Sequence, residues 1–236
     1  MSALGHYIEE AGIATVAIAL IRPQAERTRP PRALWVPFEL GRPFGPPSDP
    51  AFQKGVILAA LRLLEADTGP VLLADFPEDD PRETPDPRWH PPIEPAARGE
   101  AALAAEIAAL AAPYQRSCRE RGRTTVGLSG MSPAAAAEYV AAWLNGMPPA
   151  SPVPDMSPIL ALRFAVDDLK AYALEAAIAG GTRPSSRQLG DWLWNQTATG
   201  AAIRELRRLL TDSPDDRAKL IATMFLVPAL RAMPGG

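Results

Sequence analysis

Residues 9–43, EEAGIATVAIALIRPQAERTRPPRALWVPFELGRP, decide the fold that this sequence predicts. Ile13–Leu20 is a nearly all-apolar, β-branched run of strand length, which is typical of a strand buried on both faces of a parallel sheet. Pro23 ends this strand and favours a short helical turn through Glu26. Leu34–Phe38 is apolar and aromatic and predicts a second strand. Strand, short helix and strand together form half of an α/β sandwich.

The sequence on either side of this stretch adds helices and one further extended segment. An amphipathic helix is expected over Leu4–Ala11, before the first strand. A second helix is expected over residues 50–66, because Ser48 or Asp49 is a good N-cap in front of a proline at the first helical position. Val71–Ala74 is either a third strand or a short extended piece.

Residues 75–98 are charged and dense in proline, so they cannot form regular secondary structure. They are either a solvated linker or a segment that packs on the body of the protein. Phe76, Trp89 and Ile93 favour packing, because leaving a large apolar side chain in water costs ~1.5–3 kcal/mol. We therefore expect this segment to wrap over the protein, where it could cover the mouth of the α/β unit.

From Gly99 onward the sequence is alanine-rich and has helical periodicity. The expected helices cover Glu100–Arg121, Pro133–Leu144, Pro158–Ala179, Gln188–Leu210 and residues 214–232. Pro113 is expected to disturb the first of these, and Gly200 to bend or divide the fourth. Thr124–Leu128 is a short extended segment that could join the sheet.

The predicted fold class is α/β: a small parallel sheet with flanking helices, followed by a mainly α-helical C-terminal part. The expected domains are an α/β unit over residues 1–75, a Pro-rich connecting segment over 76–98 and a helical region over 99–236. A sheet of two or three short strands leaves an open edge, and such edges are usually covered or paired. We therefore expect a homodimer or a hetero-complex.

Composition excludes several classes of protein. At 236 residues the chain is long enough to bury a proper core. Its net charge of −3, from 24 basic and 27 acidic residues, gives no argument for nucleic-acid binding. The single cysteine excludes a disulfide framework and a zinc motif on cysteines, and suits a reducing cytoplasm. Residues 13–21 are too short to span a membrane, and no signal peptide is expected after Met1.

Arg22, Arg32 and Arg42 are the principal candidates for ligand binding. Arg22 and Arg42 lie near the carboxyl ends of the predicted strands, where open parallel sheets bind ligands, and Arg32 leads into the second strand. A guanidinium binds a carboxylate with two parallel hydrogen bonds, so a small carboxylate is the expected ligand. Alternatively, these are surface arginines paired with nearby acidic residues. Gly41 allows the backbone to approach an anion, but no cofactor fingerprint is present and no cofactor is expected.

Other polar residues are weaker candidates. Cys118 is flanked by arginines, which lower a thiol pKa, and is a weak catalytic candidate. A redox centre needs a second sulfur, so Cys118 is better interpreted as a passive helix residue. His6 and His90 are expected to be structural. Asp167 and Asp168 are expected on a solvated helix face, where adjacent residues point about 100° apart, and no metal site is predicted.

Four features of the N-terminal region resemble, in order and spacing, a known family of reductase components. They are the A-G-I-x-x-V turn at Ala11–Val16, a proline soon after the strand, Arg32 before a hydrophobic run, and P-x-x-L-G-x-P at Pro37–Pro43. The family is the selenoprotein B component of glycine, sarcosine, betaine and D-proline reductases. The resemblance covers roughly residues 4 to 65.

The resemblance implies an α/β fold and reduction of small amino-acid-like substrates at a selenocysteine or cysteine centre. In the family, a selenocysteine followed by paired cysteines lies immediately before the opening helix, and this sequence begins at Met1, just after that place. A selenocysteine codon is also a stop codon, so the resemblance implies one of two alternatives: the reading frame is cut at Met1, or the motif has been lost.

Two functions follow from this resemblance. One is an oxidoreductase of the reductase type that binds an amino-acid-like or carboxylate compound and depends on a redox group absent from this sequence. The other is a non-catalytic binding or assembly subunit that keeps only the family scaffold. Redox-active residues beside the N-terminal sheet, from this chain or from a partner, would distinguish the two.

Overall fold

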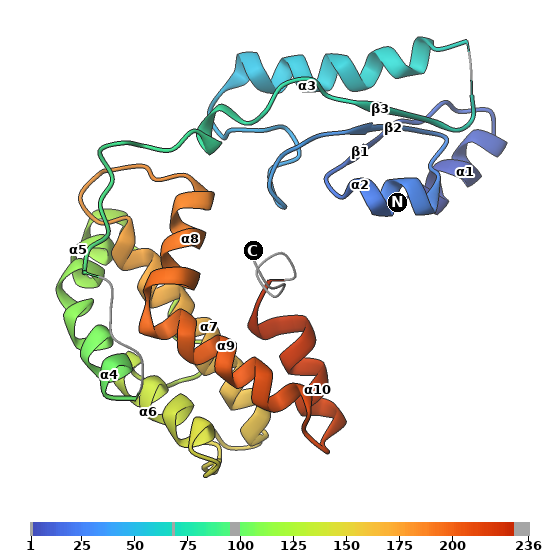
Figure 1. Cartoon of the computed structure of the whole chain (residues 1–236). Coiled ribbons are helices and arrows are strands. Elements are labelled where there is room, and N and C mark those ends of the chain that lie inside the picture. Colours follow the sequence, from blue (N-terminus) through green and yellow to red (C-terminus); the bar gives the residue numbers. More distant parts are fainter. Residues whose placement is uncertain (1, 68, 95–99, 229–236) are drawn as a thin grey trace. The chain divides into compact units, whose positions relative to one another are not determined.

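The structure is a computed structural model that describes residues 2–67, 69–94 and 100–228 (Figure 1). The chain divides into two compact units, Met1–Thr84, called unit 1, and Pro85–Gly236, called unit 2. Unit 1 contains a small parallel sheet with helices on it, and unit 2 is helical. The predicted fold class is therefore confirmed.

The sheet of unit 1 has three short parallel strands in the order β1-β2-β3. They are β1 (Ala17–Ala19), β2 (Arg32–Trp35) and β3 (Leu72–Asp75). Ala33 in the central strand pairs with Ala17 on one side and with Leu73 on the other. All three carboxyl ends therefore meet at one edge of the sheet.

Helices cover both faces of this sheet. Figure 1 shows α3 (Pro50–Arg62) on one side and α1 (Ser2–Glu10) with α2 (Arg22–Thr28) on the other. Short 3-10 turns, η1 (Leu63–Glu65) and η2 (Pro81–Glu83), follow α3 and β3. The side that faces α3 carries the larger core, whose buried members are Leu34, Val36, Phe38, Val56, Ala60 and Phe76.

Two details of the predicted strands are wrong. Ile13–Leu20 does not form one strand buried on both faces: only its residues 17–19 pair, each is half-buried, and Ile13 is 62% exposed. β1 is only half-buried because it lies at an edge of the sheet, whereas β2 lies in the buried centre. The second strand begins at Arg32 and ends at Trp35, shortly before Pro37, which has no N–H to donate to a ladder. The extended segment near Val71 does join the sheet, as β3.

Unit 2 is built around its longest helix, α7 (Pro158–Ala177), as Figure 1 shows. The other helices are α4 (Glu100–Ala109), α5 (Ala111–Arg121), α6 (Pro133–Leu144), α8 (Ser186–Gln196), α9 (Ala198–Thr211) and α10 (Asp216–Ile221), which continues into a π-helical turn, η3 (Ala222–Leu226). Leu162, Val166, Leu169 and Ala173 recur at helical spacing along α7 and are almost fully buried. α7 touches α5, α6, α8, α9 and α10, and is thus the central helix of the unit.

Local capping chemistry sets several helix starts where the sequence predicts them. Asp49 accepts a hydrogen bond from the N–H of Phe52 at the start of α3. Ser132 caps α6 in the same way, with Pro133 at its first position. These boundaries depend on neighbouring residues alone, and the predictions for them are confirmed.

Three helix predictions need correction. The helix expected over Glu100–Arg121 divides at Leu110, and Pro113 lies in the first turn of α5, where a missing N–H is tolerated. The helix expected over Gln188–Leu210 divides at Thr197, whose side chain caps α9. The last helix, expected from residue 214, begins at Asp216 after the N-cap Asp215, and residues 229–236 lie outside the described part of the chain.

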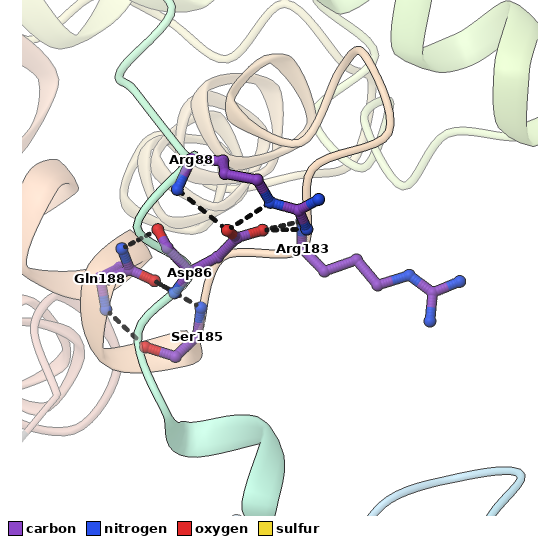
Figure 2. A network of polar contacts seen from close by, with 5 residues as sticks. All are labelled: Asp86, Arg88, Arg183, Ser185 and Gln188. Atoms are coloured by element: carbon purple, nitrogen blue, oxygen red, sulfur yellow. Dashed lines mark hydrogen bonds and ion pairs between the residues drawn. The ribbon is translucent and has the colours of Figure 1, made fainter.

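Residues 85–94, called the strap below, lie on unit 2 through a polar network (Figure 2). The Asp86 N–H donates to Gln188 Oε1 at 2.8 Å, and Gln188 Nε2 donates to the Asp86 carbonyl at 3.0 Å. Gln188 also completes a capping box with Ser185 at the start of α8. Hydrogen bonds from the Arg88 side chain and backbone to the Asp86 carboxylate lower the pKa of Asp86 to about 2.

The large apolar side chains of the Pro-rich segment are packed, as expected, but they belong to two different units. Phe76 is buried in the core of unit 1, where it contacts the rings of Phe38 and Phe52. Trp89 and Ile93 pack on the core of unit 2, and Trp89 Nε1 donates to the Ala177 carbonyl at 2.9 Å. The chain therefore passes from one unit to the other within this segment, at Thr84.

Candidate functional site

The carboxyl edge of the unit 1 sheet brings a basic, an aromatic and an acidic side chain together. Arg22 begins α2 shortly after β1, Trp35 ends β2 and Asp75 ends β3. The Arg22 guanidinium carbon lies 5.6 Å from the centre of the Trp35 ring, and its Nη1 lies 3.1 Å from Asp75 Oδ1. This Arg22 cluster presents a cation, an aromatic face and a carboxylate at one point.

A second carboxylate, that of Glu26, lies 3.4 Å from Arg22 Nε. The side chains of Arg22, Asp75 and Glu26 are 39%, 48% and 54% exposed, so each ion pair contributes only ~0–1 kcal/mol. Arg22 Nη1 is shielded from solvent and forms no well-directed hydrogen bond within the described residues, so its contact with Asp75 is Coulombic. A ligand could therefore replace these contacts at low cost.

Arg32 lies at the opposite end of β2 and has a structural role. Its Nη1 donates to Glu9 Oε1 at 2.6 Å, and both groups are largely buried. The same oxygen accepts hydrogen bonds from the N–H and hydroxyl of Thr15. Burial raises the pKa of Glu9, but the hydrogen bonds from Thr15 and Arg32 outweigh it, and the pKa is lowered overall. Arg32 thus holds the end of α1 against the sheet.

Arg42 and Gly41 lie in the loop after β2. Arg42 Nη1 is 3.4 Å from Glu39 Oε2, and both side chains are partly exposed. Gly41 has a φ of +90°, a conformation that favours glycine, and no atom lies within 4 Å of where a Cβ would be. The three arginines each pair with different carboxylates, so the structure does not gather them into one cluster.

The weaker candidates are dispersed over both units. Cys118 is half-buried on α5, and the sequence contains no second sulfhydryl to pair with it. His6 Nε2 lies 2.8 Å from the Arg29 carbonyl, a contact that links α1 to the end of α2. His90 is exposed in the strap.

Asp168 is buried, and the expectation that it lies on a solvated face is wrong. It is 1% exposed and accepts four hydrogen bonds from the loop after α5: three from the N–H groups of Gly127, Leu128 and Ser129, and one from the Ser129 hydroxyl. Asp167, its neighbour, is partly exposed and lies 2.8 Å from Lys170 Nζ. The carboxylate of Asp168 therefore sets the path of this loop.

Glu175, two turns further along α7, holds the preceding part of the same loop. Its Oε1 accepts hydrogen bonds from the N–H and hydroxyl of Thr125, and its Oε2 accepts one from Thr124. Burial raises the pKa of Glu175, but these hydrogen bonds outweigh burial, so the pKa is lowered. Thr124–Leu128, which the sequence allows as a further strand of the sheet, is instead fixed to α7.

Unit 2 also contains a groove of about 820 Å³ that sequence reasoning missed. It lies along α9 and is bounded by the ends of α6 and α8 and the start of α4; it is called the α9 groove below. Its apolar wall includes Leu103, Trp194 and Ala198, and its polar rim includes Asn195 and Arg204. No motif in the sequence marks it, because its residues come from four separate helices.

Comparison of the chain with protein-family models, curated proteins and solved structures finds no match. Within residues 2–67, 69–94 and 100–228, no helix has both the length and the apolar character required to cross a bilayer. Over the same residues, no group of three or more His, Cys, Asp or Glu side chains is placed to hold a metal ion.

Proposed function

We propose that this chain binds a small amino-acid-like compound at the Arg22 cluster, in the manner of the B component of glycine, sarcosine, betaine and D-proline reductases. The supporting observation is that Arg22 and Asp75, of opposite charge, meet beside Trp35 at the carboxyl edge of a parallel sheet. Ligands of open parallel sheets bind at this edge.

The charges of the cluster suit a zwitterion better than a simple carboxylate. Arg22 faces both Asp75 and Glu26, so the cluster has no net positive charge to attract an anion alone. A zwitterion offers a carboxylate to the guanidinium and an ammonium to the two carboxylates, which satisfies both signs. The ring of Trp35 adds a face on which an alkylated ammonium is attracted.

Reductase chemistry at this site would require a redox group from outside the sequence described here. Reversible two-electron chemistry of this type uses a thiolate or selenolate with a nearby thiol. Cys118 is the single cysteine of the sequence and lies in unit 2, on α5. The chain then contributes substrate binding, and a second component contributes the reducing centre.

Thermal denaturation with sarcosine tests the binding proposal, since a ligand that prefers the folded state raises the melting temperature. Sarcosine should raise the melting temperature of the wild-type protein, and Arg22→Ala should abolish the rise. Arg27→Ala is the matched control, because Arg27 is an exposed arginine on the same helix. An equal rise in all three proteins would overturn the proposal. Amide shifts in NMR should fall at the ends of β1, β2 and β3.

The alternative is a non-catalytic assembly subunit, and the surface of unit 1 favours it. Within the described residues, β1 and β3 each pair on one side alone, and Ile57, Leu58 and Leu61 of α3 are 41%, 41% and 48% exposed. Open edges and exposed apolar side chains are typical of association surfaces. Sedimentation velocity should then detect a dimer that Leu58→Glu weakens and the exposed Lys54→Glu does not. A monomer at every concentration would exclude homodimerisation.

A further inference from the structure

We propose that the α9 groove of unit 2 is a second binding site, for a small organic molecule that carries a carboxylate or phosphate group. The groove has a volume of about 820 Å³, within the range of roughly 300–1,000 Å³ that is usual for small-molecule sites. All the residues that line it belong to unit 2. The site is therefore separate from the Arg22 cluster and does not depend on the function proposed for it.

Arg204 is the residue that points to an oxyanion. It lines the groove from α9 and is half-buried, and in the described part of the chain no carboxylate lies within ion-pair distance of it. Its Nη2 donates to Asn195 Oδ1 at 3.3 Å, while its Nε is shielded from solvent and has no hydrogen-bond partner among these residues. A guanidinium has five N–H donors, so most of those on Arg204 remain for a ligand.

The neighbouring arginine of the groove differs from Arg204. Arg208, one turn later on α9, donates from both Nε and Nη2 to Glu205, at 2.9 and 2.6 Å. Its charge is therefore already balanced by a carboxylate. Arg204 is held in place by an uncharged amide, which orients the guanidinium without neutralising it.

The N-terminus of α9 does not compete for the anion. Glu106 already accepts hydrogen bonds from the N–H groups of Ala198 and Thr199, and the N–H of Gly200 donates to Thr197 Oγ1. The donors that usually attract an anion to a helix start are thus satisfied within the protein. Arg204 is left as the cationic partner for an oxyanion in this groove.

The other residues that line the groove indicate the chemical character of the rest of the ligand. Leu103, Leu144, Trp194 and the alanines of α9 form an apolar wall. Glu100, whose Oε2 accepts a hydrogen bond from Asn145 Nδ2, lies on the rim and can accept another from a hydroxyl or amine. The ligand is therefore a compact molecule with an apolar body and an oxyanion at one end.

Amide NMR titration of the full chain with benzoate and, separately, phenyl phosphate tests this site. Ionic strength is kept constant with sodium chloride, because surface charge attraction is screened by salt. At least one probe should give saturable shifts of the amides in residues 195–202. The probe that binds more tightly identifies the oxyanion as a carboxylate or a phosphate.

Variants of α9 make the test specific. Arg204→Ala should weaken binding at least tenfold, which corresponds to about 1.4 kcal/mol. Arg207→Ala is the matched control, since it removes an arginine of the same helix that does not line the groove, and its affinity should equal that of wild type. If Arg204→Ala is poorly folded, Asn195→Ala provides a second test, because it releases the guanidinium and should also weaken binding.

Three results would overturn the proposal. The first is the absence of saturable shifts in residues 195–202 with either probe. The second is equal affinity of wild type, Arg204→Ala and Arg207→Ala, which would indicate unspecific Coulombic attraction. The third is shifts confined to the sheet edge of unit 1, which would assign binding to the Arg22 cluster alone.

Discussion

Glu106 on α4 holds the first turn of α9 through Thr199, which lies 93 residues later in the chain. Its Oε1 accepts hydrogen bonds from both the N–H of Thr199, at 2.9 Å, and its hydroxyl, at 2.6 Å. Glu106 is 3% exposed, and its Oε2 accepts a hydrogen bond from the N–H of Ala198. Glu106 thus completes the cap of α9 from another helix, because among the described residues the local N-cap Thr197 accepts only the N–H of Gly200.

Glu106→Ala should lower the free energy of unfolding of unit 2 by about 3 kcal/mol, because it leaves buried donors unsatisfied. Glu106→Gln keeps an acceptor and should cost less. Urea denaturation followed by tryptophan fluorescence measures both, since Trp192 and Trp194 are buried in this unit. Glu138→Ala, at an exposed position on α6, should stay within about 0.5 kcal/mol of wild type. A similarly small effect for Glu106→Ala would contradict the capping role.

Glu175 should make unit 2 sensitive to acid. Its folded-state pKa is lowered from the ordinary value of 4.5, so its contribution to stability is complete above that value. The contribution is lost as the pH falls through the lowered folded-state pKa, where Glu175 becomes protonated and releases Thr124 and Thr125. Glu175→Gln should therefore reduce stability at neutral pH and flatten its decline below about pH 4.5.

Denaturant midpoints measured from pH 3 to 7 test this prediction for Glu175, with Glu138→Gln as the control. The control should keep the wild-type slope, because Glu138 is exposed on α6. Parallel curves for wild type and Glu175→Gln would mean that other groups control the acid response.

Gly200 and Gly55 should respond to alanine with opposite signs. A Cβ on Gly200 would overlap the backbone carbonyl oxygen of Leu193, so Gly200→Ala should destabilise unit 2 by about 2 kcal/mol. Gly55 lies within α3 with no atom inside 4 Å of a new Cβ, and Gly55→Ala should stabilise unit 1 by about 0.5–1 kcal/mol. Thermal denaturation of both variants tests this prediction. Equal shifts of the melting temperature would rule out the close contact at Gly200.

Gln188→Ala should release the strap from unit 2. The substitution removes both hydrogen bonds to the backbone of Asp86 and half of the capping box with Ser185. Limited proteolysis should then cut residues 85–94 faster than in wild type, while circular dichroism keeps the same helix content. Gln115→Ala, exposed on α5, should leave the cleavage rate unchanged. Equal rates for the two variants would show that the remaining contacts, including those of Trp89 and Ile93, hold the strap without Gln188.

The predictable parts of this fold depend on neighbouring residues. Ser132-Pro133 and Asp49-Pro50 each contain the capping side chain and the proline that start a helix, so their boundaries follow from local chemistry. The existence of β1 and β2 can be predicted from their apolar runs, although the residues that pair cannot. Which strand takes the buried centre depends on β3, which lies more than 35 residues after β2.

The parts that could not be predicted depend on distant contacts. Asp168 looks like a solvated residue beside Asp167, and only the loop 39–41 residues earlier makes it a buried acceptor. Arg22 and Arg32 are both ligand-binding candidates in the sequence, but Arg22 meets Asp75 from β3, whereas Arg32 meets Glu9 at the other end of the sheet. Arg204 has no signal of its own, because the α9 groove exists only once four helices assemble.

The pairing of Asp86 with Gln188 also sets an order of events during synthesis. The two residues are 102 positions apart, so the strap has no partner until α8 has been made. At a synthesis rate of about 5–20 residues per second, the strap waits for roughly 5–20 s after it is translated. All of unit 1 has been synthesised by then, because it ends at Thr84. The sheet can therefore form while residues 85–94 are still without their partner. Docking of the strap on Gln188 then requires that α8 has folded.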